Sequence, residues 1–145
     1  MGKNVTYYDM AENDYQFLTF DHDNGRVGNV MCYVSQNVCE RYLKHLIDVY
    51  CREIDTTSAL KTHSLKVLKK FMNENLPDFV CDWRTVMKAD GFYFSSRYPG
   101  DDSFLVDGDD VEDCWEAVEE VRSAVNAYLQ TREVGHVDIV SEIES

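Results

Sequence analysis

The sequence has no long apolar run, no signal peptide and no closely paired cysteines. Among its 145 residues, no run approaches the roughly 18 apolar residues that a membrane-spanning helix needs. The N-terminal stretch MGKNVTYYDMAEND lacks the basic and apolar regions of a signal peptide. We therefore expect a cytoplasmic protein that does not associate with a membrane.

The cysteines are odd in number and scattered, which excludes two familiar roles. None forms a C-x-x-C pair, so neither a disulfide framework nor a zinc knuckle is indicated. We expect reduced, partly buried thiols at all five positions: Cys32, Cys39, Cys51, Cys81 and Cys114.

Basic residues are also scarce: 14 Lys and Arg stand against 27 Asp and Glu, for a net charge of −13. Residues 41–88 are mildly basic, with nine Lys and Arg against six acids, whereas residues 101–145 carry fourteen acids against two arginines. Such a surface repels polyanions, which counts against broad nucleic-acid binding. A small anion site or a local RNA contact on the middle segment stays open.

Helical periodicity dominates what is present. Apolar residues recur at three- and four-residue steps over 8–18, over 27–49, from a proposed N-cap at Thr62 to Leu76, and over 111–128, with a shorter segment at 79–87. This pattern predicts an all-α, up-and-down bundle of four to five helices. We expect one helical domain over residues 1–132 and a short acidic tail over 133–145.

A long aromatic-rich loop, ADGFYFSSRYPGDDSFLVDGDD, precedes the last helix. Its single arginine, Arg97, has three readings: a structural clasp on a buried carboxylate such as Glu40, an anion-binding group, or a catalytic residue. We favour them in that order, and Tyr98 could stack beneath the guanidinium. Loops of this length in compact domains are usually functional or face a partner.

The aspartates that begin the last helix are interpreted as caps that satisfy its free N–H groups. No ligand set converges on them, so no metal is predicted. The sequence also lacks a G-x-S-x-G nucleophile motif, a phosphate loop and a dinucleotide fingerprint, so no cofactor is expected.

Histidine and arginine are the remaining candidates for chemistry. His45 follows Arg41 by four residues on the predicted second helix, so both could project from one face. His63 follows the Thr62 cap. An arginine and a histidine on one face could act on RNA, the first holding phosphate and the second moving a proton. A solvated helix face explains each pair more simply.

Three stretches together resemble the HEPN domain family. They are QNVCERYLKHLI, THSLKVLKKFM, and SSRYPGDD followed by the final helix, and their order covers about residues 7–130. The matching residues are Gln36, Glu40, Leu43 and Lys44 in the first, His63, Leu65 and Leu68 in the second, and Arg97, Tyr98 and Pro99 in the third.

The resemblance implies a bundle of about five helices that commonly forms a homodimer. Members of the family often accompany a minimal nucleotidyltransferase, where they act as a toxin partner or help to bind a nucleotide. Catalytic members are metal-independent ribonucleases with R-x(4–6)-H near the last helix pair. Here Arg41–His45 and Arg132–His136 have three intervening residues, and Arg97 has no histidine downstream before His136.

We therefore expect a non-catalytic domain that binds a nucleotide, a partner protein or both, with Arg97, Tyr98, Arg41 and Lys44 as ligand contacts. One alternative is a metal-independent endoribonuclease toxin that uses an atypical site drawn from Arg97, Arg41, His45 and His63. Another is a purely structural dimerisation module. Knowledge of the neighbouring genes, an adjacent nucleotidyltransferase above all, would do most to decide among these three readings.

Overall fold

A computed structural model describes the backbone of residues 4–92, 99–100 and 104–144, and the side chains of that set up to Arg132. Every element in this part of the chain is a helix, as predicted. They are α1 (Tyr7–Asp23), α2 (Asn29–Tyr50), α3 (Thr57–Lys61), α4 (Leu65–Asn75), α5 (Trp83–Met87) and α7 (Gly108–Glu144). None of the described helices is long and apolar enough to cross a membrane.

Short polar side chains fix where the helices begin. Thr6 caps α1 reciprocally with Asp9, since each accepts a hydrogen bond from the backbone N–H of the other, at 3.0 and 3.1 Å. Asp107 and Asp110 form the same pair at the start of α7, at 2.9 and 3.0 Å. The prediction that aspartates cap the last helix is therefore confirmed.

Two sequence predictions about helix limits need correction. Ser64, not Thr62, caps α4: its hydroxyl accepts from the N–H of Val67 at 3.2 Å, while Thr62 ends α3. The apolar stripe that began at Val27 starts before its helix, because α2 begins at Asn29 and Val27 is exposed. The five-residue α3 was not predicted, since it is too short to show a period.

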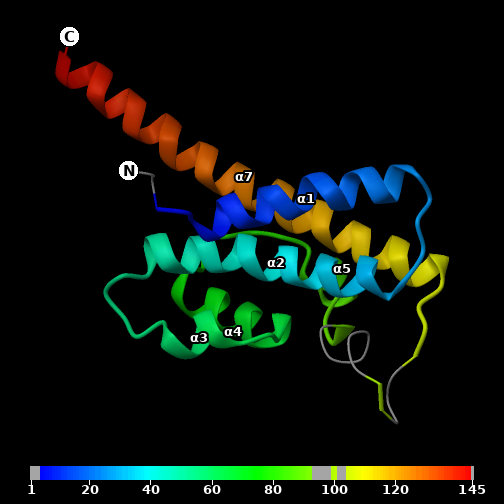
Figure 1. Ribbon diagram of the computed structural model, residues 1–145. Coiled ribbons are helices and arrows are strands. Elements are labelled where there is room, and N and C mark those ends of the chain that lie inside the picture. Colours follow the sequence, from blue (N-terminus) through cyan, green and yellow to red (C-terminus); the bar gives the residue numbers. More distant parts are fainter. Residues whose placement is uncertain (1–3, 93–98, 101–103, 145) are drawn as a thin grey trace.

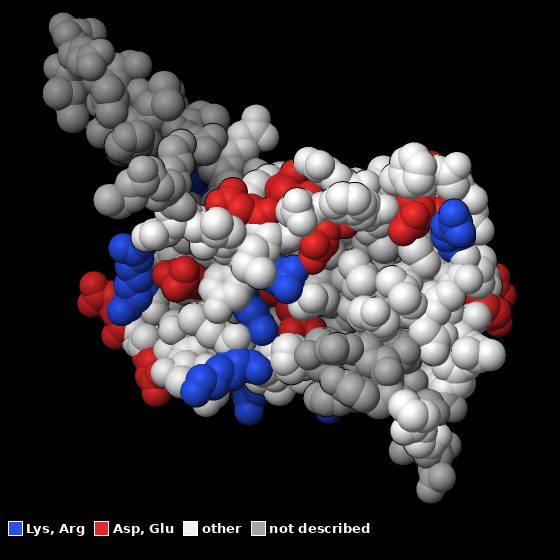
Figure 2. Space-filling model, in the orientation of Figure 1, with Lys and Arg blue, Asp and Glu red and all other residues white. Residues whose placement is uncertain are grey.

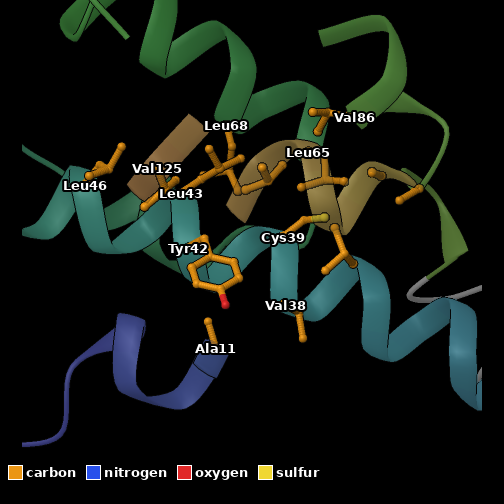
Figure 3. Close-up of a cluster of buried hydrophobic side chains, with 14 of the residues drawn as sticks. Ala11, Val38, Cys39, Tyr42, Leu43, Leu46, Leu65, Leu68, Val86 and Val125 are labelled. Atoms are coloured by element: carbon orange, nitrogen blue, oxygen red, sulfur yellow. The ribbon is translucent and has the colours of Figure 1, made fainter. Parts of the chain in front are cut away.

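The long helix α2 is the centre of the bundle (Figure 1). Helix α1 runs antiparallel to it on one side, α3 and α4 lie on another, and α7 passes in the same direction as α2. Twelve of its 22 residues are buried, so α2 contacts neighbours around most of its circumference. Figure 3 shows Tyr42 of α2 pointing toward Ala11 of α1, with Leu65 and Leu68 of α4 on the other side.

Hydrogen bonds spaced seven residues apart align α1 with α7. The hydroxyl of Tyr8 donates to Asn126 at 2.7 Å and that of Tyr15 to Glu119 at 2.6 Å. Each seven-residue step forward on α1 is matched by seven residues back on α7, which defines an antiparallel register. Because seven residues are nearly two helical turns, these contacts stay on one face of each helix.

The end of the chain continues α7. The prediction of a separate acidic tail over 133–145 rested on composition, whereas the backbone of 133–144 belongs to the same helix as residues 108–132. Figure 1 shows this part of α7 extending beyond the other helices. The proposed boundary at 132 stays a prediction.

Candidate functional site

Arg97 and Tyr98 lie outside the described residues, so their predicted roles stay predictions. The chain on either side of them is anchored. Before them, Asp90 accepts a hydrogen bond from the backbone N–H of Leu65 at 2.8 Å, at the start of α4. After them, Asn29 at the start of α2 bonds the carbonyl of Phe104 at 2.9 Å and the N–H of Val106 at 2.8 Å.

A buried polar stripe crosses the middle of α2. Gln36, Glu40 and Lys44 are spaced by four residues, so they lie on one face of the helix. That face meets the junction between α3 and α4: Gln36 donates to the carbonyl of His63 at 2.5 Å, and Lys44 to the carbonyl of Thr62 at 2.7 Å. The structure thus brings two of the three motifs that carried the family resemblance into direct contact.

Glu40 is the centre of this stripe and is fully buried. Its Oε1 lies 3.4 Å from Nζ of Lys44 and 3.1 Å from Nδ1 of His63. Its Oε2 is buried and has no hydrogen-bond partner within the described part of the chain. Burial raises the pKa of Glu40 above its ordinary value, and the neighbouring Lys44 and His63 oppose that rise.

The arrangement fits an orienting role for Glu40. A carboxylate that holds one ring nitrogen of a histidine fixes the ring orientation, as in general-base pairs. The side chain of His63 is 38% exposed, whereas that of Glu40 is 1% exposed. His63 therefore extends from a buried anion to the surface.

Arg41 and Lys44, the predicted anion contacts on α2, point to different sides. Lys44 faces α3 and α4, whereas Arg41 forms an ion pair with Asp14 of α1. The side chains of Arg41 and Asp14 are each about one quarter exposed, at 24% and 29%. Both cations thus already have carboxylate partners in the folded protein.

His45 lies in a separate place from His63. It lines a shallow groove of about 630 Å³ formed with Thr6, Tyr8, Asp9, Asn126, Leu129 and Gln130. Its ring centroid is 5.4 Å from that of Tyr8. Burial lowers the pKa of His45 below its ordinary value, although Asp48 and Asp9 oppose the change. The two candidate histidines therefore do not share a site.

Another arginine network lies between α1, α2 and α7. Arg122 bonds Glu12 through Nε at 2.9 Å and Nη2 at 3.3 Å, and Tyr42 donates to the same carboxylate at 2.6 Å. These contacts lower the pKa of Glu12, against the opposing effect of burial. The network is engaged internally, so it stabilises the bundle.

Sequence reasoning missed the partners of its candidates. Asp14 was not selected because one carboxylate among 27 carries no signal by itself. Its position one turn before Leu18, on the same face of α1 as that buried residue, was the available hint. The role of Thr62 as acceptor for Lys44 was missed because every residue has a backbone carbonyl, so the sequence does not show which one is used. No group of three or more His, Cys, Asp or Glu within the described residues could hold a metal ion.

Comparison with protein families identifies one match: the HEPN domain model covers residues 6–128. This range holds the polar stripe, both candidate histidines and the network around Glu12. No curated protein and no solved structure matches the chain.

Proposed function

Because the chain belongs to the HEPN family, we propose that it is a non-catalytic HEPN domain that acts by binding a protein partner. One observation carries this proposal: both predicted anion contacts on α2 are already paired with acids, Arg41 with Asp14 and Lys44 with Glu40. A nucleotide phosphate at either cation would have to displace a carboxylate.

The energetic argument is strongest at Lys44. Its ammonium lies 3.4 Å from a fully buried carboxylate and also donates to a backbone carbonyl at 2.7 Å. Among the described residues, drawing Lys44 toward a phosphate would leave Glu40 with His63 as its remaining ion-pair partner, and an uncompensated buried charge costs several kcal/mol. The same competition, weakened by solvent, applies to Arg41.

His45 also argues against ribonuclease chemistry. Cleavage of RNA needs a proton-transfer group close to a cation that stabilises the phosphate. The nearest arginine along α2 from His45 is Arg41, which is bound to Asp14. Lowering of the pKa of His45 by burial favours the neutral ring, which by itself stabilises no phosphate charge.

The family resemblance supplies the class of partner that we propose, a minimal nucleotidyltransferase, and a homodimer of the chain as its state. Binding of a nucleotide is an alternative to this proposal, since it would depend on Arg97 rather than on the paired cations of α2. A purely structural dimerisation module would show self-association with no further partner.

A ribonuclease is the second candidate, and one contact favours it. Glu40 and His63 form the carboxylate–histidine pair that general-base chemistry uses, at 3.1 Å. In this reading Arg97 would hold the phosphate. Two separate substitutions, His63→Ala and Arg97→Ala, test it.

The experiment has three arms. Purified protein is incubated overnight with structured and single-stranded RNA in the presence of EDTA, titrated calorimetrically with ATP and GTP, and co-expressed with minimal nucleotidyltransferases from the same genome. We expect intact RNA, no binding heat, and co-elution with a nucleotidyltransferase on a sizing column. RNA cleavage that His63→Ala and Arg97→Ala both abolish would overturn the proposal in favour of the ribonuclease.

Nucleotide binding would also overturn the proposal as stated. Thermal melting of Arg97→Ala, run beside the titrations, separates a structural clasp from a ligand contact. A lower melting temperature identifies a clasp, whereas an unchanged melting temperature with lost nucleotide binding identifies a ligand contact.

A further inference from the structure

Large apolar side chains are exposed along the outer side of α1 and the neighbouring part of α2. Phe17 is 69% exposed, Val30 56% and Met10 40%. Single exposed apolar residues are ordinary, but a group of them on one face marks an interaction surface. Figure 2 shows a largely white area over the first half of α2, on the right of the molecule, with red patches of Asp and Glu along α1 above it.

Two adjacent hollows lie between the two helices. One, of about 230 Å³, is lined by Asp14, Phe17, Leu18, Asp21, Val30, Met31 and Val34. The other, of about 360 Å³, is lined by Val5, Asp9, Met10, Asn13, Asp14 and Arg41. Both include Asp14, so they meet at its ion pair with Arg41. We call the two hollows together the α1–α2 groove.

The dimensions of the α1–α2 groove suit a helix. Met10 and Asp21 are eleven residues apart on α1, which corresponds to about 16 Å along the helix axis. A helical ligand places apolar anchors at i, i+3 or i+4 and i+7, which span about 10 Å. Two hollows separated by an ion pair could each receive one such anchor.

The charge of the α1–α2 groove selects the kind of helix. Three aspartates line it, Asp9, Asp14 and Asp21, and among the described residues Arg41, paired with Asp14, is its one lining cation. The groove therefore combines net negative charge with apolar side chains, most of which line the hollow beside Phe17. A second copy of this chain would bring the same negative charge and repel, and anionic lipid would be repelled as well.

We propose that the α1–α2 groove binds a basic amphipathic helix of a partner protein. This inference rests on the proposed partner-binding function and adds the surface and the chemistry of the partner. The apolar side chains of the helix enter the two hollows, and its Lys or Arg side chains reach Asp21 and the other acids of the rim.

A designed peptide tests the proposal. The probe is a fluorescently labelled amphipathic helix of Leu and Lys, about 18 residues and thus about 27 Å long. Its control has Glu in place of every Lys. Fluorescence anisotropy is recorded on the full chain at low and at physiological salt. We expect the Lys peptide to bind, more weakly as salt rises, and the Glu peptide not to bind.

Two pairs of variants locate the binding. Phe17→Ser should lower the affinity for the Lys peptide by about tenfold, because it removes an apolar contact with the bound helix. Its control, Ile54→Ser, changes an exposed apolar residue between α2 and α3 and should bind as the wild type does. Asp21→Asn should weaken binding by a smaller factor and reduce its salt dependence. The matching control, Glu53→Gln, should change neither.

Three outcomes would overturn the inference. The first is that the Lys peptide does not bind at roughly millimolar concentration. The second is that Phe17→Ser binds the Lys peptide as tightly as the wild type does. The third is that the wild type sediments as a dimer and Phe17→Ser dissociates it. The last would identify a second copy as the occupant. None of these results is RNA cleavage or nucleotide binding, so failure here is distinct from failure of the proposed function.

Discussion

The ammonium of Lys44 lies 3.4 Å from Oε1 of Glu40, one helical turn earlier on α2, and neither side chain is more than 7% exposed. Lys44→Met should therefore lower the free energy of unfolding by about 3–5 kcal/mol, because it leaves a buried carboxylate without its main cation. Urea denaturation measures the loss. The control Lys66→Met, at an exposed position of the neighbouring α4, should stay within about 0.5 kcal/mol of the wild type.

The cost of Lys44→Met should depend on pH. Burial raises the pKa of Glu40 above 4.5, so the folded state holds its proton more tightly than the unfolded chain does. Stability from this group is present below 4.5 and is lost as pH rises through the folded pKa. The gap in unfolding free energy between wild type and Lys44→Met should therefore narrow as pH falls toward 4.5. A constant gap from neutral pH to 4.5 would show that the charge of Glu40 is not the cause.

Tyr42 provides a test of the network between α1 and α2. Its ring is fully buried, and its hydroxyl donates to the carboxylate of Glu12 at 2.6 Å. Tyr42→Phe should cost about 1.5–3 kcal/mol, as expected for a hydrogen bond to a charged group. Tyr50→Phe, at the exposed end of α2, is the control and should be nearly neutral. Equal losses in urea denaturation would mean that the bond to Glu12 contributes nothing specific.

His45 should make the fold sensitive to mild acid. Its pKa is lowered by burial, so the unfolded chain binds the proton more readily than the folded one. Stability from this group is complete above the ordinary value of 6.5 and is lost as pH falls through the folded pKa. An NMR titration should place the pKa of His45 below 6.5, and His45→Gln should flatten the stability profile there. A measured pKa at or above 6.5 would contradict the burial of the ring.

The thiols should react slowly in the native protein. All five cysteines are free, and four of them are buried. Burial, with help from the acids Glu120 and Asp82, raises the pKa of the remaining Cys81 to about 12, so little thiolate exists at pH 8. A thiol reagent should label the protein slowly in buffer and label five thiols rapidly in urea. A fast native phase would identify a cysteine in a more open setting than the structure gives it.

Much of the bundle was predictable because a helix with one buried face needs apolar residues at three- and four-residue steps, which are visible in the sequence. The buried stripe of α7, from Val111 to Tyr128, was predicted at the residues where the structure has it, and so was the capping of this helix by aspartates at its start. The start of α4 was misplaced because Thr62 and Ser64 are both good caps, and local chemistry does not choose between them. The hydroxyl of Thr62 instead accepts from the N–H of Ser64 at 3.1 Å, beside the carbonyl that binds Lys44.

The candidate site, too, was predictable in part from the sequence and in part only from the structure. The family resemblance had picked out Gln36, Glu40 and Lys44 in one motif and His63 in the next, without predicting that they touch. That the face would be buried, with Lys44 bound to an acid rather than open to a phosphate, required the neighbouring helices. Solvation decides whether a lysine binds a ligand or neutralises a core carboxylate, and solvation is a property of the packed bundle.

By itself the sequence determined the all-helical class, the capping of the last helix, the acidic surface and membership of the HEPN family. Each follows from spacing, composition or motif order, which are local or additive along the chain. Only the tertiary structure separated His45 from His63, paired Arg41 with Asp14, and left Phe17 and Val30 exposed beside one groove. Those facts depend on which helix faces meet, and helices distant in the sequence settle that by burying the largest apolar area that the connecting segments allow.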